Sequence, residues 1–261
     1  MSALPTTVDL TINGSRADLV LTPAREGKPP TLNHAVLDAL DTRLAEIEQR
    51  ADALRLVVVR SASERFFCVG ADIQALSTID VDTIGDWVRH GHRVFNRLED
   101  LPVPVVARVD GFALGGGLEL ALACDCIYAA DTAKVGQTET ALGFITGWGG
   151  AARLAARIGP GHARELLFAG RVLEATDAAA LGLIDRCASA EAIDAALNQF
   201  QHELEEAAPE AVCQMKQLMR ATSTVDRTVS LEAEVAGSIR CLQSEETRRR
   251  LADFLAKRRK A

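Results

Sequence analysis

The stretch "GFALGGGLELALAC", residues 111–124, places three consecutive glycines before an apolar segment that carries one charge, Glu119. The apolar residues favour a helix that begins near Gly116, with Glu119 in its first turn. Backbone N–H groups at a helix start lack partners within the helix and carry partial positive charge. The glycines therefore admit two interpretations: an amide that donates to a developing oxyanion, or close backbone packing without a ligand.

Glu119 itself needs an explanation, because both of its neighbours, Leu118 and Leu120, are apolar. A buried carboxylate without a partner costs several kcal/mol. A capping box does not account for it, since that motif needs Ser or Thr three residues earlier, where Gly116 stands. Two interpretations stay open: a structural salt bridge, and a catalytic acid or base.

Two further glycine-containing stretches have a similar pattern. In "FFCVGADIQAL", residues 66–76, a glycine turn follows a strand and precedes a helical piece, so it could supply a second main-chain donor. In "AKVGQTETALGFITGWGG", residues 133–150, a second carboxylate, Glu139, lies between glycine-rich turns and apolar residues. The intervening strand could return Glu139 to the rim that holds Glu119. Two carboxylates in a dry pocket suit proton transfer.

The wider pattern predicts a layered α/β core. Strands are expected at residues 8–12 and 17–21, joined by an Asn-Gly turn, and as buried β-branched runs at 54–60 and 102–109. Helices are expected at residues 31–50, with Asn33 as N-cap, and at 84–101, and residues 118–130 run from helix into strand. Helical pieces separated by glycines follow residue 150. We predict an α/β core over residues 1–190 and a helical C-terminal region over residues 191–261.

Composition narrows the class of protein. The 261-residue chain has a net charge of −7, which argues against nucleic acid as its main partner. Its start does not resemble a signal peptide, and no apolar run is long enough for a membrane span, so we expect a soluble protein. Six cysteines without a compact disulfide framework favour the cytoplasm.

Two local features remain. Cys124 and Cys126 are expected on one face of a strand as buried structural thiols, with no metal bound, because no histidine lies near them in the sequence. The basic stretch "TRRRLADFLAKRRK", residues 247–260, is either a solvated amphipathic helix or a local anion site.

The sequence closely resembles the enoyl-CoA hydratase/isomerase (crotonase) family. The resemblance extends over about residues 8–259, and its most specific motifs are the three glycine-containing stretches. The resemblance implies a crotonase-like α/β fold of repeated β-β-α units, followed by a helical trimerisation region. It also implies a homotrimer or a dimer of trimers. The substrate would be an acyl-CoA thioester, with no separate cofactor because coenzyme A is part of the substrate.

The resemblance also implies roles for individual residues. The backbone amides of Ala71 and Gly116 would polarise the thioester carbonyl, Glu119 would position and deprotonate water, and Glu139 would exchange a proton with C2. The implied reaction adds water across the C2–C3 double bond of a 2-enoyl-CoA. Substrate contacts are implied at Lys28, Gly70, Asp72, Ile73, Gly115, Trp148 and Lys257.

The sequence departs from the family pattern at a few positions. Gln74 and Thr146 stand where lysine and proline are common, and Trp148 fills a site near the acyl pocket that is often smaller. Two alternative functions stay open: a 3,2-enoyl-CoA isomerase, which could work with Glu139 alone, and a non-catalytic subunit that binds acyl-CoA or RNA.

Overall fold

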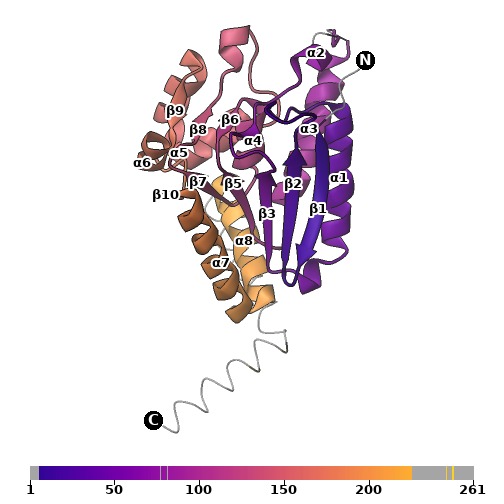
Figure 1. The fold of residues 1–261 in the computed structure, drawn as a ribbon, viewed down its shortest axis with the longest axis vertical. Helices are drawn as coiled ribbons and strands as arrows, with labels where there is room; N and C mark the ends of the chain where they lie inside the picture. The colour runs from indigo at the N-terminus through magenta and orange to yellow at the C-terminus, as the bar shows by residue number, and fades with distance from the viewer. Residues whose placement is uncertain (1–5, 77, 81, 225–244, 246–248, 250–261) are drawn as a thin grey trace.

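The computed structural model describes residues 6–76, 78–80, 82–224, 245 and 249 (Figure 1). Its strands are β1 (Thr7–Asn13), β2 (Arg16–Thr22), β3 (Leu56–Ser61), β4 (Phe66–Cys68), β5 (Val105–Val109), β6 (Phe112–Leu114), β7 (Cys126–Ala130), β8 (Lys134–Gly136), β9 (Val172–Glu174) and β10 (Arg186–Ala188). Its α-helices are α1 (His34–Glu48), α2 (Ile73–Leu76), α3 (Ile84–Glu99), α4 (Gly116–Leu122), α5 (Gly150–Ala169), α6 (Ala175–Ala180), α7 (Ala190–Glu206) and α8 (Pro209–Thr224).

The larger sheet has the strand order β1-β2-β3-β5-β7-β10. Strands β1 and β2 form an antiparallel hairpin, and the remaining pairs are parallel. The central strand β3 is buried on both faces: Val57 and Val59 belong to one hydrophobic cluster, and Leu56 and Val58 to another. The continuous apolar run in the sequence thus has its physical cause in burial on both faces of a parallel sheet.

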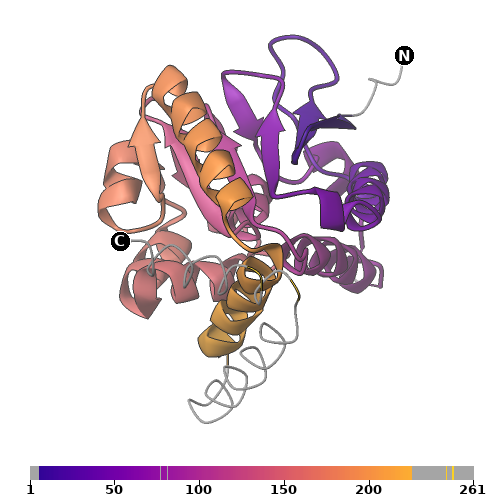
Figure 2. The same cartoon turned by 90° about the horizontal axis from the view of Figure 1, so that it is seen from below.

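Helices cover the two faces of this sheet. Leu37, Leu40 and Leu44 of α1 join the same cluster as Val57, and α1 packs against α3. On the opposite face, Ile193 and Leu197 of α7 pack in the cluster of Leu56. Both views show α1 and α3 together on one side of the molecule, and Figure 2 shows α7 crossing the strands (Figures 1 and 2).

A second, smaller sheet has the order β4-β6-β8-β9. Strands β4, β6 and β8 are parallel neighbours, and β9 pairs antiparallel with β8. The chain leaves β4 toward Gly70, leaves β6 toward α4, and leaves β8 toward Glu139. Because parallel strands end at the same edge of a sheet, this sheet brings the three glycine-containing stretches together.

Several sequence predictions are confirmed. The hairpin forms, and Asn33 caps α1 by accepting a hydrogen bond from the Val36 amide at 3.0 Å. Helix α4 begins at Gly116, with Glu119 in its first turn. The expected glycine break after residue 150 lies inside α5, where Gly159 leaves helical geometry with a φ of 79°.

Other expectations were wrong or incomplete. Cys124 does not share a strand with Cys126: it lies in the turn after α4, buried, whereas β7 starts at Cys126, which is half-buried. The short strands β9 and β10 lie after residue 150, in the part of the chain where helical pieces separated by glycines were expected.

Nothing among the described residues is a helix both long and apolar enough to cross a membrane. Most of the basic stretch 247–260, including Lys257, lies outside the described residues.

Candidate active site

Glu119 is 2% exposed and is held in place by backbone amides. Its Oε1 accepts hydrogen bonds from the amides of Trp148 at 2.7 Å and Gly150 at 2.8 Å. Burial raises the pKa of Glu119, and the amides of Gly150, Trp148 and Gly147 oppose that rise. Glu119 forms no salt bridge with any described residue, so the salt-bridge interpretation does not hold within that part of the chain.

The amide cradle depends on a glycine. A Cβ on Gly150 would lie 2.9 Å from both Cγ and Oε1 of Glu119. Contacts this short are not tolerated without movement of the carboxylate. The glycine-rich turn at residues 147–150 therefore serves to bring main-chain donors against a buried side chain.

Glu139 begins a short 3-10 helix, η2 (Glu139–Leu142), directly after β8. A Cβ on Gly115 would lie 3.2 Å from Glu139 Oε1, so this carboxylate stands beside the glycine triplet. The buried Gln137, with its amide nitrogen turned toward Glu139, donates to Oε1 at 3.0 Å and to Oε2 at 3.1 Å. Burial, helped by the charge of Glu119, raises the pKa of Glu139 to about 7.

The two glycine turns meet at their backbones. Gly70 has a φ of +89°, and a Cβ there would lie 2.9 Å from the amide nitrogen of Gly116. Gly115, with a φ of +53°, precedes α4 and leaves Gly116 as the first helical residue, whose N–H has no partner within the helix. Close packing and an available amide, the two interpretations of these glycines, thus occur together.

The amide of Ala71 faces the same region. The Leu32 amide donates to the carbonyl of Gly70, and the Asp72 amide donates to the carbonyl of Leu32, both at 2.8 Å. In this parallel bridge the polar groups of the intervening residue, Ala71, point away from Leu32. The backbone N–H groups of Ala71 and Gly116 are therefore both unused by these contacts.

These groups surround one cavity of about 430 Å³, which we call the glutamate cavity. It is lined by the predicted site residues Gly70, Ala71, Ile73, Gly115, Gly116, Glu119, Glu139 and Trp148. The other described residues that line it are Val69, Leu76, Ile84, Trp87, Val88, His92, Thr138, Leu142, Phe144, Ile145, Thr146 and Gly147.

Two predicted substrate contacts, Lys28 and Asp72, are not among the described residues that line this cavity. The Asp72 carboxylate instead accepts hydrogen bonds from the amides of Gln74 and Ala75, and so caps the start of α2. Lys28 is exposed in the loop between β2 and α1, away from the cavity lining. Lys257 lies outside the described residues.

Trp148 forms a buried wall of the glutamate cavity. Its indole occupies a notch in α3, since a Cβ on Gly91 would lie 2.0 Å from Cδ1 of the ring. The ring packs 5.1 Å from Trp87 and 5.5 Å from Phe95, centroid to centroid. Its Nε1 donates to the carbonyl of Trp87 at 3.4 Å. Trp148 thus contributes both an apolar side chain to the cavity and a backbone donor to Glu119.

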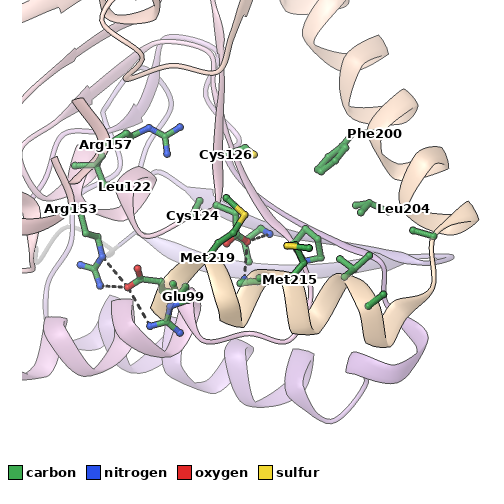
Figure 3. Close-up of a pocket in the computed structure, with 18 of the residues that line it drawn as sticks. Glu99, Leu122, Cys124, Cys126, Arg153, Arg157, Phe200, Leu204, Met215 and Met219 are labelled. Carbon is green, nitrogen blue, oxygen red and sulfur yellow. Dashed lines mark hydrogen bonds and ion pairs between the residues drawn. The ribbon is translucent and has the colours of Figure 1, made fainter. Parts of the chain in front are cut away.

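A larger cavity, of about 680 Å³, lies between α7, α8 and the larger sheet (Figure 3). We call it the α7–α8 cavity. Met215 and Met219 of α8 and Phe200 of α7 point into it, and neither Glu119 nor Glu139 lines it. Among the described residues, no group of three or more His, Cys, Asp or Glu side chains could hold a metal ion in either cavity.

The chain matches the sequence model of the family described as enoyl-CoA hydratase/isomerase over residues 22–261. It belongs to this family. The crotonase resemblance of the three glycine-containing stretches is therefore confirmed at the level of the family.

Relatives of the enoyl-CoA hydratase/isomerase family agree with this assignment. The short-chain-enoyl-CoA hydratase of Clostridium acetobutylicum is 32% identical over 230 residues, which cover 87% of each chain. The mitochondrial methylglutaconyl-CoA hydratase of Mus musculus is 44% identical over 154 residues, which cover 56% of this chain and 49% of the relative. The chain thus matches only about half the length of the second relative.

The fold agrees as well. The crystal structure of an enoyl-CoA hydratase from Bacillus anthracis superimposes with a TM-score of 0.89 at 30% identity, covering 97% of both chains. The predicted crotonase-like α/β fold is therefore confirmed.

Sequence reasoning missed two residues of this family site. Gln137 contacts Glu139, and its position two residues earlier in "GQTETALG" was the available signal. Trp87 lines the cavity from α3, and nothing in the sequence distinguished it from an ordinary core aromatic.

Proposed function

We propose that this protein is an enoyl-CoA hydratase, which adds water across the C2–C3 double bond of a 2-enoyl-CoA to give a 3-hydroxyacyl-CoA. One observation carries the proposal: a buried carboxylate, Glu119, a half-buried carboxylate, Glu139, and two available backbone amides, of Ala71 and Gly116, line one cavity. The hydratases among the relatives support the same reaction.

The proposed chemistry starts at the thioester oxygen. The N–H groups of Ala71 and Gly116 donate to this oxygen, which polarises the conjugated double bond. Glu119 accepts a proton from water while the water oxygen bonds to C3. The electron pair of the double bond moves toward C1, and the thioester oxygen becomes an enolate oxygen held by the two amides.

Glu139 then completes the addition. Its carboxyl proton goes to C2 as the carbonyl reforms, so one water has been added and the total charge is unchanged. Glu119 is then protonated and Glu139 ionised, and passage of that proton from Glu119 to Glu139, directly or through solvent, returns both groups to their starting states. A carboxyl with a pKa of about 7 can hold and release a proton near neutral pH. Gln137, through its contacts to both oxygens of Glu139, would orient the carboxyl group.

The proposal is tested by following the loss of enone absorbance of crotonyl-CoA. We expect turnover by the wild type and a loss of about 10²–10⁴-fold in Glu139→Gln, the usual range for one acid or base. Absence of hydration with every enoyl-CoA tried, together with no effect of Glu139→Gln, would overturn the assignment.

Labelled water separates hydration from the 3,2-isomerase alternative. Hydration in H₂¹⁸O leaves the label on C3 of the product, whereas isomerisation leaves none. Conversion of the substrate without label would assign the isomerase activity instead.

The substrate carries coenzyme A, so we propose that the reaction needs no separate cofactor. We also propose a homotrimer or a dimer of trimers, as the family resemblance implies. Support comes from the exposed apolar surface of α8, where Met215 and Met219 are 56% and 66% exposed beside the α7–α8 cavity. Light scattering measures the assembly directly, and a monomeric mass would contradict it. The cytoplasmic location stays a prediction.

A further inference from the structure

The glutamate cavity contains acids but no permanent cation. Among the described residues that line it, the ionisable side chains are those of Glu119, Glu139 and His92. Neither lysine nor arginine belongs to this lining. Its remaining surface is mostly apolar, with the tryptophans Trp87 and Trp148 as its largest side chains.

The guanidinium of Arg153, whose charge acts on Glu119, is directed elsewhere. Arg153 lies behind the Trp148 wall, where it donates to the Trp148 carbonyl at 2.8 Å, to Glu99 at 2.8 Å and to Asn96 at 2.6 Å. It lines the α7–α8 cavity and not the glutamate cavity (Figure 3). Arg153 is therefore not placed to meet a ligand in the glutamate cavity.

The part of the cavity outside the carboxylates is an apolar chamber between two segments. Helix α3 contributes Ile84 and Val88, and the loop before α5 contributes Leu142, Phe144 and Ile145. Several of these side chains remain open to solvent, Ile145 to 83% and Leu142 to 62%. Covering exposed apolar surface of this kind with a hydrocarbon contributes favourably to the free energy of binding.

We infer that the site accepts 2-enoyl-CoAs whose acyl group is an uncharged hydrocarbon and discriminates against acyl groups that end in a carboxylate. The inference rests on the proposed function and deepens it. A substrate carboxylate would enter a cavity that already holds two acids, would lose water, and would meet no lysine or arginine of the described lining. A hydrocarbon of the same length carries no charge that has to be desolvated.

The inference predicts a substrate preference different from that named for one relative, to which this chain is similar over part of its length. Identity with the methylglutaconyl-CoA hydratase reaches 44% over the aligned segment. The lining of the glutamate cavity nevertheless favours a substrate without the second carboxylate of a glutaconyl group. Substrate charge is thus decided by the few side chains around the acyl group.

The test compares substrates of similar length. We expect kcat/KM for glutaconyl-CoA to be about 100-fold or more below that for 2-hexenoyl-CoA, because an unpaired carboxylate is desolvated only in the former. Equal hydration of the two would overturn the inference while leaving the proposed function intact. Failure with both 2-hexenoyl-CoA and crotonyl-CoA would instead contradict the proposed function.

A gain-of-charge variant sharpens the result. Val88→Lys places an ammonium in the apolar chamber, and Val88→Met is its control of similar length without charge. We expect the ratio of glutaconyl-CoA to 2-hexenoyl-CoA turnover to rise about tenfold in Val88→Lys relative to Val88→Met. An unchanged ratio would show that charge in this chamber does not set selectivity, and so would contradict the inference.

A final variant tests His92, because among the described lining residues it has the side chain that could carry a positive charge. We expect His92→Gln to leave the substrate ratio unchanged. Appreciable hydration of glutaconyl-CoA by the wild type that is lost in His92→Gln would assign the imidazole as a carboxylate partner and overturn the inference.

Discussion

In the α7–α8 cavity, carboxylates face cations. Glu99 accepts hydrogen bonds from Arg153 (Figure 3), and the carboxylate of Asp125 lies 2.8 Å from the ammonium of Lys216. In the glutamate cavity, Glu119 and Glu139 face backbone and side-chain amides instead. An amide stabilises a carboxylate without cancelling its charge, and the charge of Glu119 also raises the pKa of Glu139. Glu139 can therefore hold and release a proton near neutral pH, whereas the carboxylates of the α7–α8 cavity are paired with cations.

The difference also explains why cavity size is a poor guide to chemistry in this protein. The α7–α8 cavity is the larger of the two, at about 680 Å³ against about 430 Å³. Its charged groups are already in ion pairs, either with each other or, for Arg157, with Asp185 outside the lining. The smaller cavity contains Glu139, whose pKa of about 7 lets it change its protonation state near neutral pH.

Replacing one carboxylate in each cavity should give the greatest difference in activity. Glu119→Gln removes the proposed base and should lower kcat/KM for crotonyl-CoA by about 10²–10⁴-fold. Glu99→Gln makes the same chemical change in the α7–α8 cavity and should alter kcat/KM by less than about threefold, because Glu99 does not line the glutamate cavity. Comparable losses in both variants would contradict the distinction between the cavities.

The next effect concerns the close approach of two glycines. In Gly70→Ala the new Cβ would meet the Gly116 amide nitrogen at 2.9 Å and displace it from the thioester oxygen. We expect kcat to fall by about 10²–10³-fold, as for the loss of one oxyanion donor. Gly14→Ala is the matched control: its φ of +59° is also positive, but nothing lies within 4 Å of the added Cβ. A fall of similar size in the control would attribute the effect to backbone strain alone.

A third variant tests the paired charges. Asp125→Asn keeps the shape of the side chain but leaves the ammonium of Lys216, which is buried, with the Val103 carbonyl as its hydrogen-bond acceptor. We expect the free energy of unfolding in urea to fall by about 2 kcal/mol, with kcat nearly unchanged. Unchanged stability would show that the pair contributes nothing measurable.

The smallest effect is a change in how stability depends on pH. The pKa of Glu139 is about 7 in the folded protein, against an ordinary value of 4.5, so between these pH values the folded state binds more protons than the unfolded chain. The free energy of unfolding of the wild type therefore falls as pH rises through this window. Glu139→Gln does not titrate and escapes that loss.

We expect the stability difference in favour of Glu139→Gln to grow by about 1 kcal/mol between about pH 5 and about pH 8, after allowance for solvent screening of a partly exposed group. Urea titrations across this range measure it. A constant difference would mean that Glu139 titrates normally.

Much of the larger sheet and the helices that cover it could be predicted from the sequence. Long apolar runs indicate buried strands, and apolar residues at helical spacing after a capping residue indicate helices. The hairpin, β3 and α1 are examples. Strands β4, β6 and β8 have three residues each, which is too short for periodicity to reveal, so the smaller sheet was not expected from the residue pattern. The same limit accounts for the missed strands β9 and β10.

The order of residues was enough to indicate that Glu119 needs an unusual environment, since burying a charge between leucines at the start of a helix is costly. It also indicated Gly70, Gly116 and Glu139 through their local glycine-rich patterns. The cavity that these residues share depends on the folded chain. Glu119 depends on amides more than 25 residues away in the chain, at Trp148 and Gly150, and Trp148 depends on the missing side chain of Gly91. Such contacts arise from packing between distant segments, which local sequence patterns do not encode.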